Sequence, residues 1–242
     1  TETIDGQLYE IGTEQNSAIY IYGIKNISTI DSLKNLLLQN GVELGGANKL
    51  LSVDLAYNTN ITAIKAVEGN EYYFTSLNLS NCTGIKELDL SKMKYLEDLN
   101  LSGCTKLTTL ILPKNGRLKS LNLKGCNMLE ELILNNLFQL ESYDITGCSK
   151  LKTIRFLGCQ KIKTLNLNDT STSKLYVENC NNLTSLTLRG KTINEIVING
   201  CKKLQTLDLS SNTFSNYTLQ LGAMTALTSL NVSSSSGITR IV

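Results

Sequence analysis

The sequence contains no histidine and no tryptophan, and Pro113 is the only proline among its 242 residues. Without histidine, the chain lacks the commonest general base of enzymes and the commonest zinc ligand. With one proline, almost the whole chain can take part in hydrogen-bonded strand ladders. No run of about 18 apolar residues occurs, so the sequence predicts no membrane span.

Charge gives no sign of a nucleic-acid partner. The 23 basic and 21 acidic residues leave a net charge of +2 and are spread along the chain, without a basic block that would neutralise phosphates. Phosphate-binding glycine motifs are missing from the sequence. Carboxylates such as Asp144 and Asp208 fall on separate repeats, roughly 14 Å apart at strand spacing, too far for a hydrolase pair. We therefore predict a protein that is not an enzyme and that uses no cofactor.

A short motif of two leucines separated by one residue recurs along most of the chain. Its step is 11 residues up to Leu165 and 10 or 11 residues from there to Leu207. Some units replace leucine with another apolar residue, as in Tyr143-Asp144-Ile145. The units begin at Leu77, Leu88, Leu99, Leu110, Leu121, Leu132, Tyr143, Ile154, Leu165, Leu175, Leu186, Ile196, Leu207 and Leu230.

Alternation with period two predicts that each unit is a short strand with its outer two residues pointing inward and its middle residue pointing outward. Eleven residues are too few for a helical crossover between parallel strands. Cysteines follow alternate units at Cys82, Cys104, Cys126 and Cys148, which are 22 residues apart. The pattern therefore predicts a repeat solenoid, with parallel strands on both sides of each 22-residue coil.

The segment Leu96–Cys104, which reads L-x-x-L-x-L-x-x-C, is similar to the characteristic segment of leucine-rich repeats, where the ninth position is Asn or Cys. The nested second unit resembles a bacterial class of short repeats of 21–22 residues, in which the convex side is also extended. The resemblance covers roughly residues 50–242 and implies a right-handed coil. It departs from the family after residue 148, where the phase of the cysteines changes.

The ends of the chain fit the repeat less well. We predict an N-terminal cap over residues 1–49, small and α/β, with a strand at 17–24 and a short helix at 29–40. The solenoid of about nine coils then covers residues 50–242. A loop is expected at residues 68–74, and residues 211–225 interrupt the repeat before it resumes.

The seven cysteines form two columns when the chain is arranged in 22-residue coils. We predict that they are buried, reduced turn residues, because a thiol is a small and mostly apolar group with a weak donor. Side chains in register point the same way, which disfavours disulfides, and the absence of C-x-x-C disfavours metal binding. The columns contain Cys82, Cys104, Cys126 and Cys148, followed by Thr170, and Cys159, Cys180 and Cys201.

One outward face is a ladder of small polar side chains, with central residues such as Asn100, Asn122, Asp144 and Asn166. It can be read as a solvated sheet in which stacked Asn and Ser side chains bond to each other, or as a hydrogen-bonding surface for a glycan or a protein.

The central column of the opposite face is apolar or carries Arg and Tyr. These residues also favour strands in general, but a contiguous apolar patch with a polar rim is typical of a contact surface, and Tyr and Arg are typical anchors. Our predicted binding residues are Ile111, Ile133, Arg155, Tyr176 and Val197.

The resemblance implies a protein–protein or host-contact module on a bacterial surface, either secreted or a lipoprotein. A glycan-binding surface is the alternative, although only Tyr176 is a clearly outward aromatic residue in the repeats. A passive spacer within a larger surface protein is the third possibility. The first residue is Thr1 rather than methionine, which we take to indicate a lost N-terminal segment such as a secretion signal. The Asn/Ser/Thr-rich surface also favours export, whereas seven unpaired cysteines weigh against an oxidising compartment.

Overall fold

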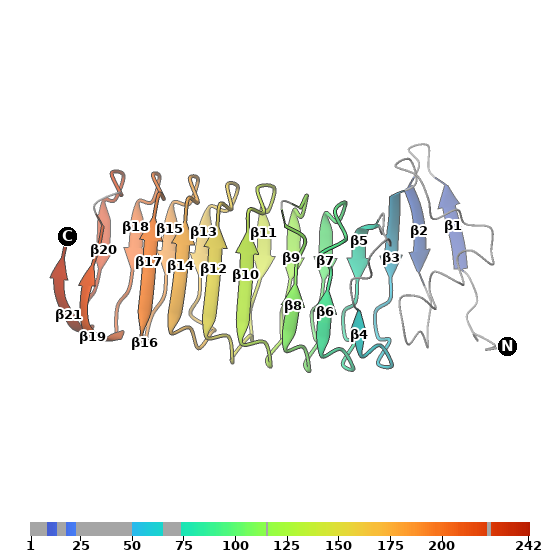
Figure 1. The fold of residues 1–242 in the computed structure, drawn as a ribbon, viewed down its shortest axis with the longest axis horizontal. Coiled ribbons are helices and arrows are strands. Elements are labelled where there is room, and N and C mark those ends of the chain that lie inside the picture. Colours follow the sequence, from blue (N-terminus) through green and yellow to red (C-terminus); the bar gives the residue numbers. More distant parts are fainter. Residues whose placement is uncertain (1–8, 14–17, 23–49, 65–73, 115, 222–223) are drawn as a thin grey trace.

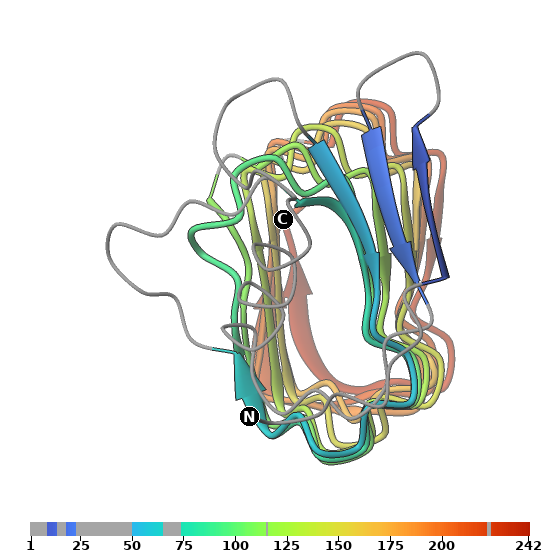
Figure 2. The same cartoon turned by 90° about the vertical axis from the view of Figure 1, so that its right-hand side faces the viewer.

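The computed structural model describes residues 9–13, 18–22, 50–64, 74–114, 116–221 and 224–242. They form a solenoid of stacked coils with about 22 residues per turn and about eight turns (Figure 1). Seen along its long axis, each coil has two extended sides that face each other (Figure 2). No helix occurs in the described ranges, and no segment of them is a helix long and apolar enough to cross a membrane. The predicted solenoid with strands on both sides is confirmed.

We call one side of the solenoid the polar wall. It consists of a seven-stranded sheet in the order β1-β2-β3-β5-β7-β9-β11 and a four-stranded sheet in the order β13-β15-β18-β20. All neighbours are parallel except β1 and β2. The strands are β1 (Tyr9–Thr13), β2 (Ala18–Tyr22), β3 (Leu50–Asp54), β5 (Phe74–Asn78), β7 (Asp98–Asn100), β9 (Ser120–Asn122), β11 (Ser142–Asp144), β13 (Thr164–Asn166), β15 (Ser185–Thr187), β18 (Thr206–Asp208) and β20 (Ser229–Asn231).

We call the opposite side the mixed wall, because its outward residues are apolar and charged. It comprises three parallel sheets, in the orders β4-β6-β8, β10-β12-β14-β17 and β16-β19-β21. The strands of the second sheet have five residues each, whereas those of the polar wall from β7 onward have three. The strands are β4 (Ala63–Ile64), β6 (Glu87–Asp89), β8 (Thr109–Ile111), β10 (Glu131–Asn135), β12 (Thr153–Leu157), β14 (Lys174–Glu178), β16 (Thr192–Ile193), β17 (Glu195–Asn199), β19 (Thr213–Leu219) and β21 (Ser236–Ile241).

The sequence predictions for the two ends have different outcomes. The strand expected at residues 17–24 is present as β2, which pairs with β3 and so continues the polar wall. Residues 211–225 were expected to interrupt the repeat, but they contain β19, a seven-residue strand that extends the mixed wall. The helix expected at 29–40 and most of the loop expected at 68–74 lie outside the described residues.

The core lies between the two walls and consists of one layer of inward side chains per coil. Leu99 and Leu101 point inward from β7 and its turn, Leu88 and Leu90 do so from β6, and all four are at most 1% exposed. Since neighbouring coils are paired in register, each leucine packs on the equivalent leucine of the next coil, as Leu99 does on Leu121. The apolar surface of one coil is therefore covered by its neighbours as much as by its own opposite side.

The Gly-Cys and Asn-Cys pairs turn the chain at the ends of the strands. The residue before each cysteine has a positive φ, as in Gly103 (75°) and Asn179 (55°), which glycine and asparagine adopt at the least cost. Each thiol donates a hydrogen bond to a carbonyl oxygen of the preceding coil, from Cys82 to Leu55 at 3.1 Å through to Cys201 to Val177 at 3.6 Å. Thr170 replaces cysteine in the same column, and its hydroxyl donates to the Leu167 carbonyl oxygen at 2.7 Å.

All seven thiols are free and fully buried. Burial raises the pKa of the Cys82 thiol to about 11 and that of Cys104 to about 12, so both are protonated at neutral pH. A hydrogen bond with the Cys180 thiol lowers the pKa of Cys159, but Cys159 is 0% exposed and cannot meet a reagent. Reactivity requires an exposed thiolate, so these cysteines are inert turn residues in the folded chain.

We predict that Ellman's reagent labels no cysteine in the native protein and all seven in denaturant. Cys126→Ala should lower the free energy of unfolding by about 1–3 kcal/mol, because it removes one of the two hydrogen-bond donors of the Leu101 carbonyl oxygen, which keeps the Cys104 amide, and opens a small cavity. Asn127→Ala, at the exposed neighbouring position, is the control and should change stability little. Native labelling at a stoichiometric level would contradict this account of the cysteine columns.

The polar wall is interrupted between β11 and β13. The peptide groups of Ser142 and Asp144 bond to the coil of β9. Because successive residues of a strand direct their peptide groups to opposite sides, those of Tyr143 face β13. They find no backbone partner there: in this fully described region, no backbone–backbone hydrogen bond joins residues 141–148 to residues 163–170. The two strands stand farther apart than their neighbours (Figure 1).

The side chain of Tyr143 fills the interval. Its hydroxyl donates to the carbonyl oxygen of Thr164 at 3.2 Å and accepts from the amide of Asn166 at 3.1 Å. These are the two groups that the Tyr143 peptide would bond in a regular ladder. Burial raises the pKa of the hydroxyl to about 12, so it keeps the proton that it donates. Tyr143 was expected to point inward; instead it is half-buried between strands, because the large side chain of Phe156 fills the core at this coil and meets its ring edge-on at 5.6 Å.

The mixed wall contains a second break of the same kind, between β17 and β19. Here Tyr217 comes from the later strand, and its hydroxyl donates to the carbonyl oxygen of Ile196 at 2.5 Å and accepts from the Ile196 amide at 3.2 Å. A phenolic hydroxyl is both donor and acceptor, so at each break one tyrosine satisfies one carbonyl and one amide of the opposing strand, from Thr164 and Asn166 at the first break and from Ile196 alone at the second.

The break beside Tyr143 predicts a local loss of amide protection. The amides of Leu123 and Gly125 donate hydrogen bonds to the carbonyl oxygens of Asp144 and Thr146 in the next coil. The equivalent amides of Ile145 and Gly147 have no such acceptor. In native-state hydrogen exchange, the amides of Ile145 and Gly147 should exchange faster by about tenfold or more. Equal protection at the two pairs would mean that β11 and β13 are joined by a regular ladder in solution.

Candidate functional site

The candidate site is the row of outward central residues on the mixed wall. The structure brings four of the five predicted residues into adjacent positions of one sheet, since Ile133 pairs with Arg155, Arg155 with Tyr176, and Tyr176 with Val197. They lie at the third position of β10, β12, β14 and β17. Ile133 is 39% exposed, and the other three are half-buried by one another. We call these four residues the central row.

Two side-chain contacts hold the middle of the central row together. The Arg155 guanidinium lies 3.7 Å from the centroid of the Tyr176 ring, a close cation–π contact. The Tyr176 hydroxyl donates to Glu195 at 2.5 Å, and this bond raises the pKa of the hydroxyl. These two contacts restrain Arg155 and Tyr176 in the absence of a partner, and such restraint lowers the entropic cost of binding.

Ile111, the fifth predicted residue, belongs to a different sheet. It lies at the end of β8, where it pairs with Asp89, and β8 is not paired with β10. It is 46% exposed and continues the line of apolar side chains toward the N-terminal part of the wall. The five residues thus form one surface row, but not one continuous sheet.

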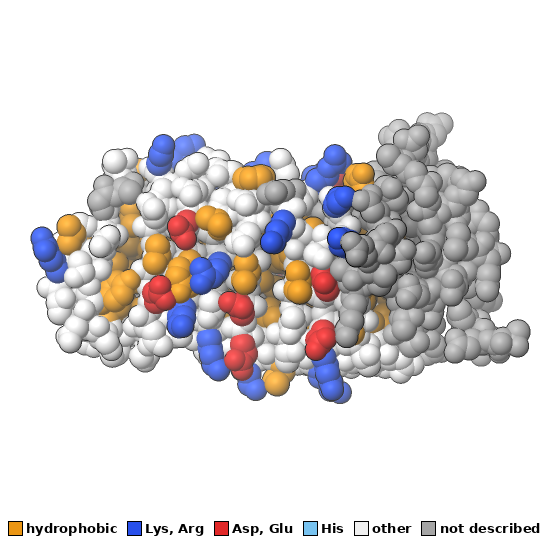
Figure 3. Space-filling view, viewed as in Figure 1, with side chains coloured by type: hydrophobic (Ala, Val, Ile, Leu, Met, Phe, Trp, Pro, Cys, Tyr) orange, Lys and Arg blue, Asp and Glu red, His pale blue; other side chains and the backbone are white. Residues whose placement is uncertain are grey.

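Charged residues border the row on both sides. Figure 3 shows the mixed wall, where hydrophobic side chains run along the middle and acidic and basic side chains lie among and below them. The border contains Glu87, Asp89, Glu131, Lys174, Glu178 and Glu195. An apolar centre with a charged rim is the usual composition of a protein contact surface.

Two exposed aromatic residues were not predicted. Phe138, in the turn after β10, is 42% exposed and lies over Gly158. The equivalent positions of other coils hold Lys94, Gln160 and Asn181, so an aromatic residue at a polar position was the signal for it. Tyr57, in the turn after β3, is 73% exposed, and among the tyrosines whose burial the structure describes it is Tyr57, not the half-buried Tyr176, that is most exposed.

The central residues of the polar wall have a structural role. The Asn122 side-chain oxygen accepts a hydrogen bond from the Lys124 amide at 3.0 Å, and the Asp144 carboxylate accepts one from the Thr146 amide at 2.8 Å. The same two-residue turn recurs at Asn78, Asn100, Asn166, Asp208 and Asn231. One of the two readings of the sequence had these side chains bonding to each other along the ladder. A few do, as Ser120 bonds Asp98 at 2.6 Å, but most bond to their own turns, as Asx turns do.

Asp144 and Asp208 have the ordinary chemistry of such turns. The hydrogen bond from the Thr146 amide lowers the pKa of Asp144. Hydrogen bonds from Arg189 and Ser210 hold the pKa of Asp208 far below its usual range. Both carboxylates are therefore ionised acceptors at neutral pH. In the part of the chain that the structure describes, no three His, Cys, Asp or Glu side chains are grouped so as to hold a metal ion.

We predict that the Arg155–Tyr176 contact contributes little to stability. A double-mutant cycle of Arg155→Ala, Tyr176→Ala and the double variant should give a coupling energy of about 0.5–1 kcal/mol in denaturant unfolding. All variants should keep the native circular dichroism spectrum, because neither residue fills the core. A coupling energy of several kcal/mol would show that the pair supports the fold and is not a free surface.

Comparisons with known proteins find matches to leucine-rich-repeat proteins. The family model described as "BspA type Leucine rich repeat region" matches in six copies, over residues 54–164 and 139–241. No curated protein matches the sequence. Among solved structures, a leucine-rich-repeat protein of Leptospira interrogans is 15% identical, with 86% of this chain and 70% of that one covered and a TM-score of 0.30. An internalin of Listeria monocytogenes is 14% identical, with 93% and 86% covered and a TM-score of 0.25.

Proposed function

This chain belongs to the BspA-type leucine-rich repeat family, and from that premise we propose that it is a non-catalytic module that binds a protein through the mixed wall. The contact would be centred on the central row and extended by Ile111. The single observation that carries this proposal is the in-register alignment of Ile133, Arg155, Tyr176 and Val197 on one sheet.

The composition of the two walls supports the choice of the mixed wall. On the polar wall, the central Asn and Asp side chains already bond to their own turns. On β10, β12, β14 and β17 the strands are two residues longer than the three-residue strands of the polar wall, and their central residues cap no turn. The apolar surface that Ile133 and Val197 still expose is covered only if a partner binds there, and Arg and Tyr are frequent hot-spot residues of interfaces.

A protein partner fits the central row better than a glycan. Sugars stack on the open face of an aromatic ring, but Arg155 covers one face of Tyr176 at 3.7 Å. The exposed Tyr57 offers an alternative platform, yet it lies in a turn away from the central row. A passive spacer would need no row of exposed apolar, Arg and Tyr side chains. We keep the spacer as the function to be inferred if neither a protein nor a glycan binds.

We further propose that the module works at a bacterial surface or outside the cell. The family membership supports this location, and so does the state of the cysteines. Free thiols are unusual in an oxidising compartment, but here all seven are fully buried and so cannot meet an oxidant or a second cysteine from solution.

The proposal is tested by placing a photo-crosslinking residue at position 133 and, as the control, at Thr187 on the polar wall. On illumination with intact host or neighbouring bacterial cells, we expect a crosslinked protein from position 133 alone. The double variant Arg155→Ala/Tyr176→Ala should lower affinity for that protein by about tenfold or more, because buried anchors contribute roughly 2 kcal/mol or more each. Ser185→Ala/Thr206→Ala on the polar wall should leave it unchanged.

The other outcomes are equally informative. Crosslinking from Thr187 alone, or unchanged affinity in the folded double variant, would remove the mixed wall as the binding surface. A glycan array probed in parallel would reveal carbohydrate binding. Silence in both experiments would favour the spacer.

A further inference from the structure

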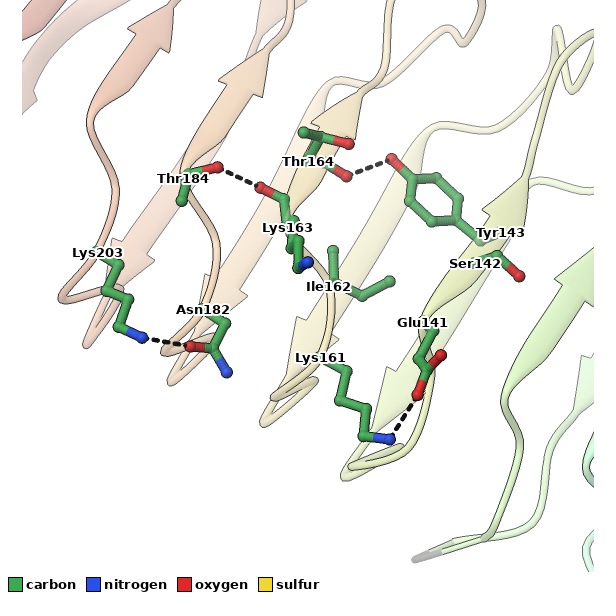
Figure 4. A pocket seen from close by; sticks show the side chains of 10 residues that line it. All are labelled: Glu141, Ser142, Tyr143, Lys161, Ile162, Lys163, Thr164, Asn182, Thr184 and Lys203. Atoms are coloured by element: carbon green, nitrogen blue, oxygen red, sulfur yellow. Dashed lines mark hydrogen bonds and ion pairs between the residues drawn. The ribbon is translucent and has the colours of Figure 1, made fainter.

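The break between β11 and β13, on the polar wall, opens into a hollow with a volume of about 940 Å³ (Figure 4). We call the interval and this hollow the Tyr143 gap. It lies on the opposite side of the solenoid from the central row, and the proposed function makes no use of it. The lining residues that bear on its chemistry are Glu141, Tyr143, Lys161, Ile162, Lys163 and Lys203.

Both edges of the Tyr143 gap present peptide groups without backbone partners. On the β11 side these are the amide and carbonyl of Tyr143 and the amide of Ile145, and on the β13 side the amide of Thr164 and the carbonyl of Asn166, all in described segments. Such groups alternate along a strand edge and are the template that an added strand recognises.

The interval between β11 and β13 is wider than the spacing of two paired strands. Paired strands lie about 4.8 Å apart, and a tyrosine side chain is longer than that spacing. Because the Tyr143 side chain spans the interval and reaches Thr164 and Asn166 with its hydroxyl, it holds β11 and β13 apart by more than one strand spacing (Figure 4). The Tyr143 hydroxyl makes the two hydrogen bonds that join the strand edges, and the Glu141–Lys161 ion pair joins the two coils just before the strands begin.

The charge at the start of the two strands is positive. Glu141 is the only acidic residue that lines the hollow, and it is paired with Lys161 at 2.5 Å. Lys203 bonds the neutral side-chain oxygen of Asn182 at 2.8 Å, and Lys163 forms no ion pair within 4 Å among the described residues, although its charge also acts on Glu141. Acidic side chains would therefore be attracted to this end of the gap.

We propose that the Tyr143 gap binds an extended peptide segment of a partner protein as an added parallel strand, with acidic side chains at the N-terminal end of that segment. The parallel direction follows from β11 and β13, which run the same way as every other strand of this wall from β2 onward. In this direction the N-terminal end of the peptide lies beside Lys163, and Lys203, before β18 at the far end of the hollow, adds positive charge on the same side. Alternate side chains of the peptide would then point inward, over the buried Ile162. Binding displaces the Tyr143 hydroxyl from Thr164 and Asn166.

The proposal makes opposite predictions for two substitutions of Tyr143. Tyr143→Phe removes the hydroxyl that competes for Thr164 and Asn166, so it should tighten binding of an added strand by about tenfold. Tyr143→Leu restores the residue found at Leu121 in the preceding coil and at Leu165 in the next, which should let β11 and β13 pair directly and abolish binding. Tyr217→Phe, at the equivalent break of the mixed wall, is the matched control and should have no effect.

The probe is the peptide acetyl-EETVTVTV-amide with a fluorophore at its C-terminal end, measured by fluorescence anisotropy against the full chain. Binding should slow hydrogen exchange at the Ile145 amide. A peptide N-methylated at alternate residues should not bind, because it cannot complete both ladders, and acetyl-KKTVTVTV-amide should bind more weakly by about tenfold or more. Lys163→Glu/Lys203→Glu should reverse the preference between the two charged peptides.

The proposal is overturned by any of three results in folded protein. The first is that the peptide shows no saturable binding to the Tyr143→Phe variant at concentrations up to about 1 mM. The second is that the N-methylated peptide binds as tightly as the unmodified peptide. The third is that the Tyr143→Leu variant binds the peptide as tightly as the unsubstituted chain does. Arg155→Ala/Tyr176→Ala should leave peptide binding unchanged, so failure here and failure of the mixed wall as an interface are independent results.

Discussion

The parallel pairing of equivalent residues in successive coils is the constraint on which the rest of this structure depends. Each coil places the same kind of residue above its predecessor, so leucine packs on leucine, and each thiol reaches the carbonyl oxygen of the coil before it. A single coil has no interior of its own, and only the stack buries the leucines and satisfies the peptide groups. The stability of each coil is therefore shared with its two neighbours.

This constraint also explains why one unusual side chain can divide a wall. A leucine at position 143 would point inward and leave the peptide groups of β11 to bond directly to β13. Tyrosine cannot do so while Phe156 occupies the core, and it moves into the plane of the sheet instead. Its hydroxyl then stands in for the missing pair of peptide groups. The change of cysteine phase begins in the same coil, with Cys148 on one wall followed by Cys159 on the other.

Period-two alternation was enough to predict the strands, the inward leucines and the buried turn cysteines, because these depend on spacing along the chain alone. It also identified Ile133, Arg155, Tyr176 and Val197 as outward neighbours. The same alternation was misleading at Tyr143, which satisfies the pattern but is displaced by a residue on the opposite wall. The stacking of Arg155 on Tyr176, the division between β8 and β10, and the use of Asn122 or Asp144 to cap turns depend on side-chain geometry that spacing does not contain.

The most direct test of the 22-residue coil is the distance between outward positions one coil and one half-coil apart. Because the native thiols are buried, introduced cysteines at Ser120 and Ser142, or at Ser120 and Glu131, can be spin-labelled selectively. The first pair is in register on adjacent strands of one wall, and the second lies on opposite walls. The structure predicts strong dipolar broadening of the electron paramagnetic resonance spectrum for the first pair and much weaker broadening for the second. Comparable broadening in both, or the reverse order, would contradict the coil.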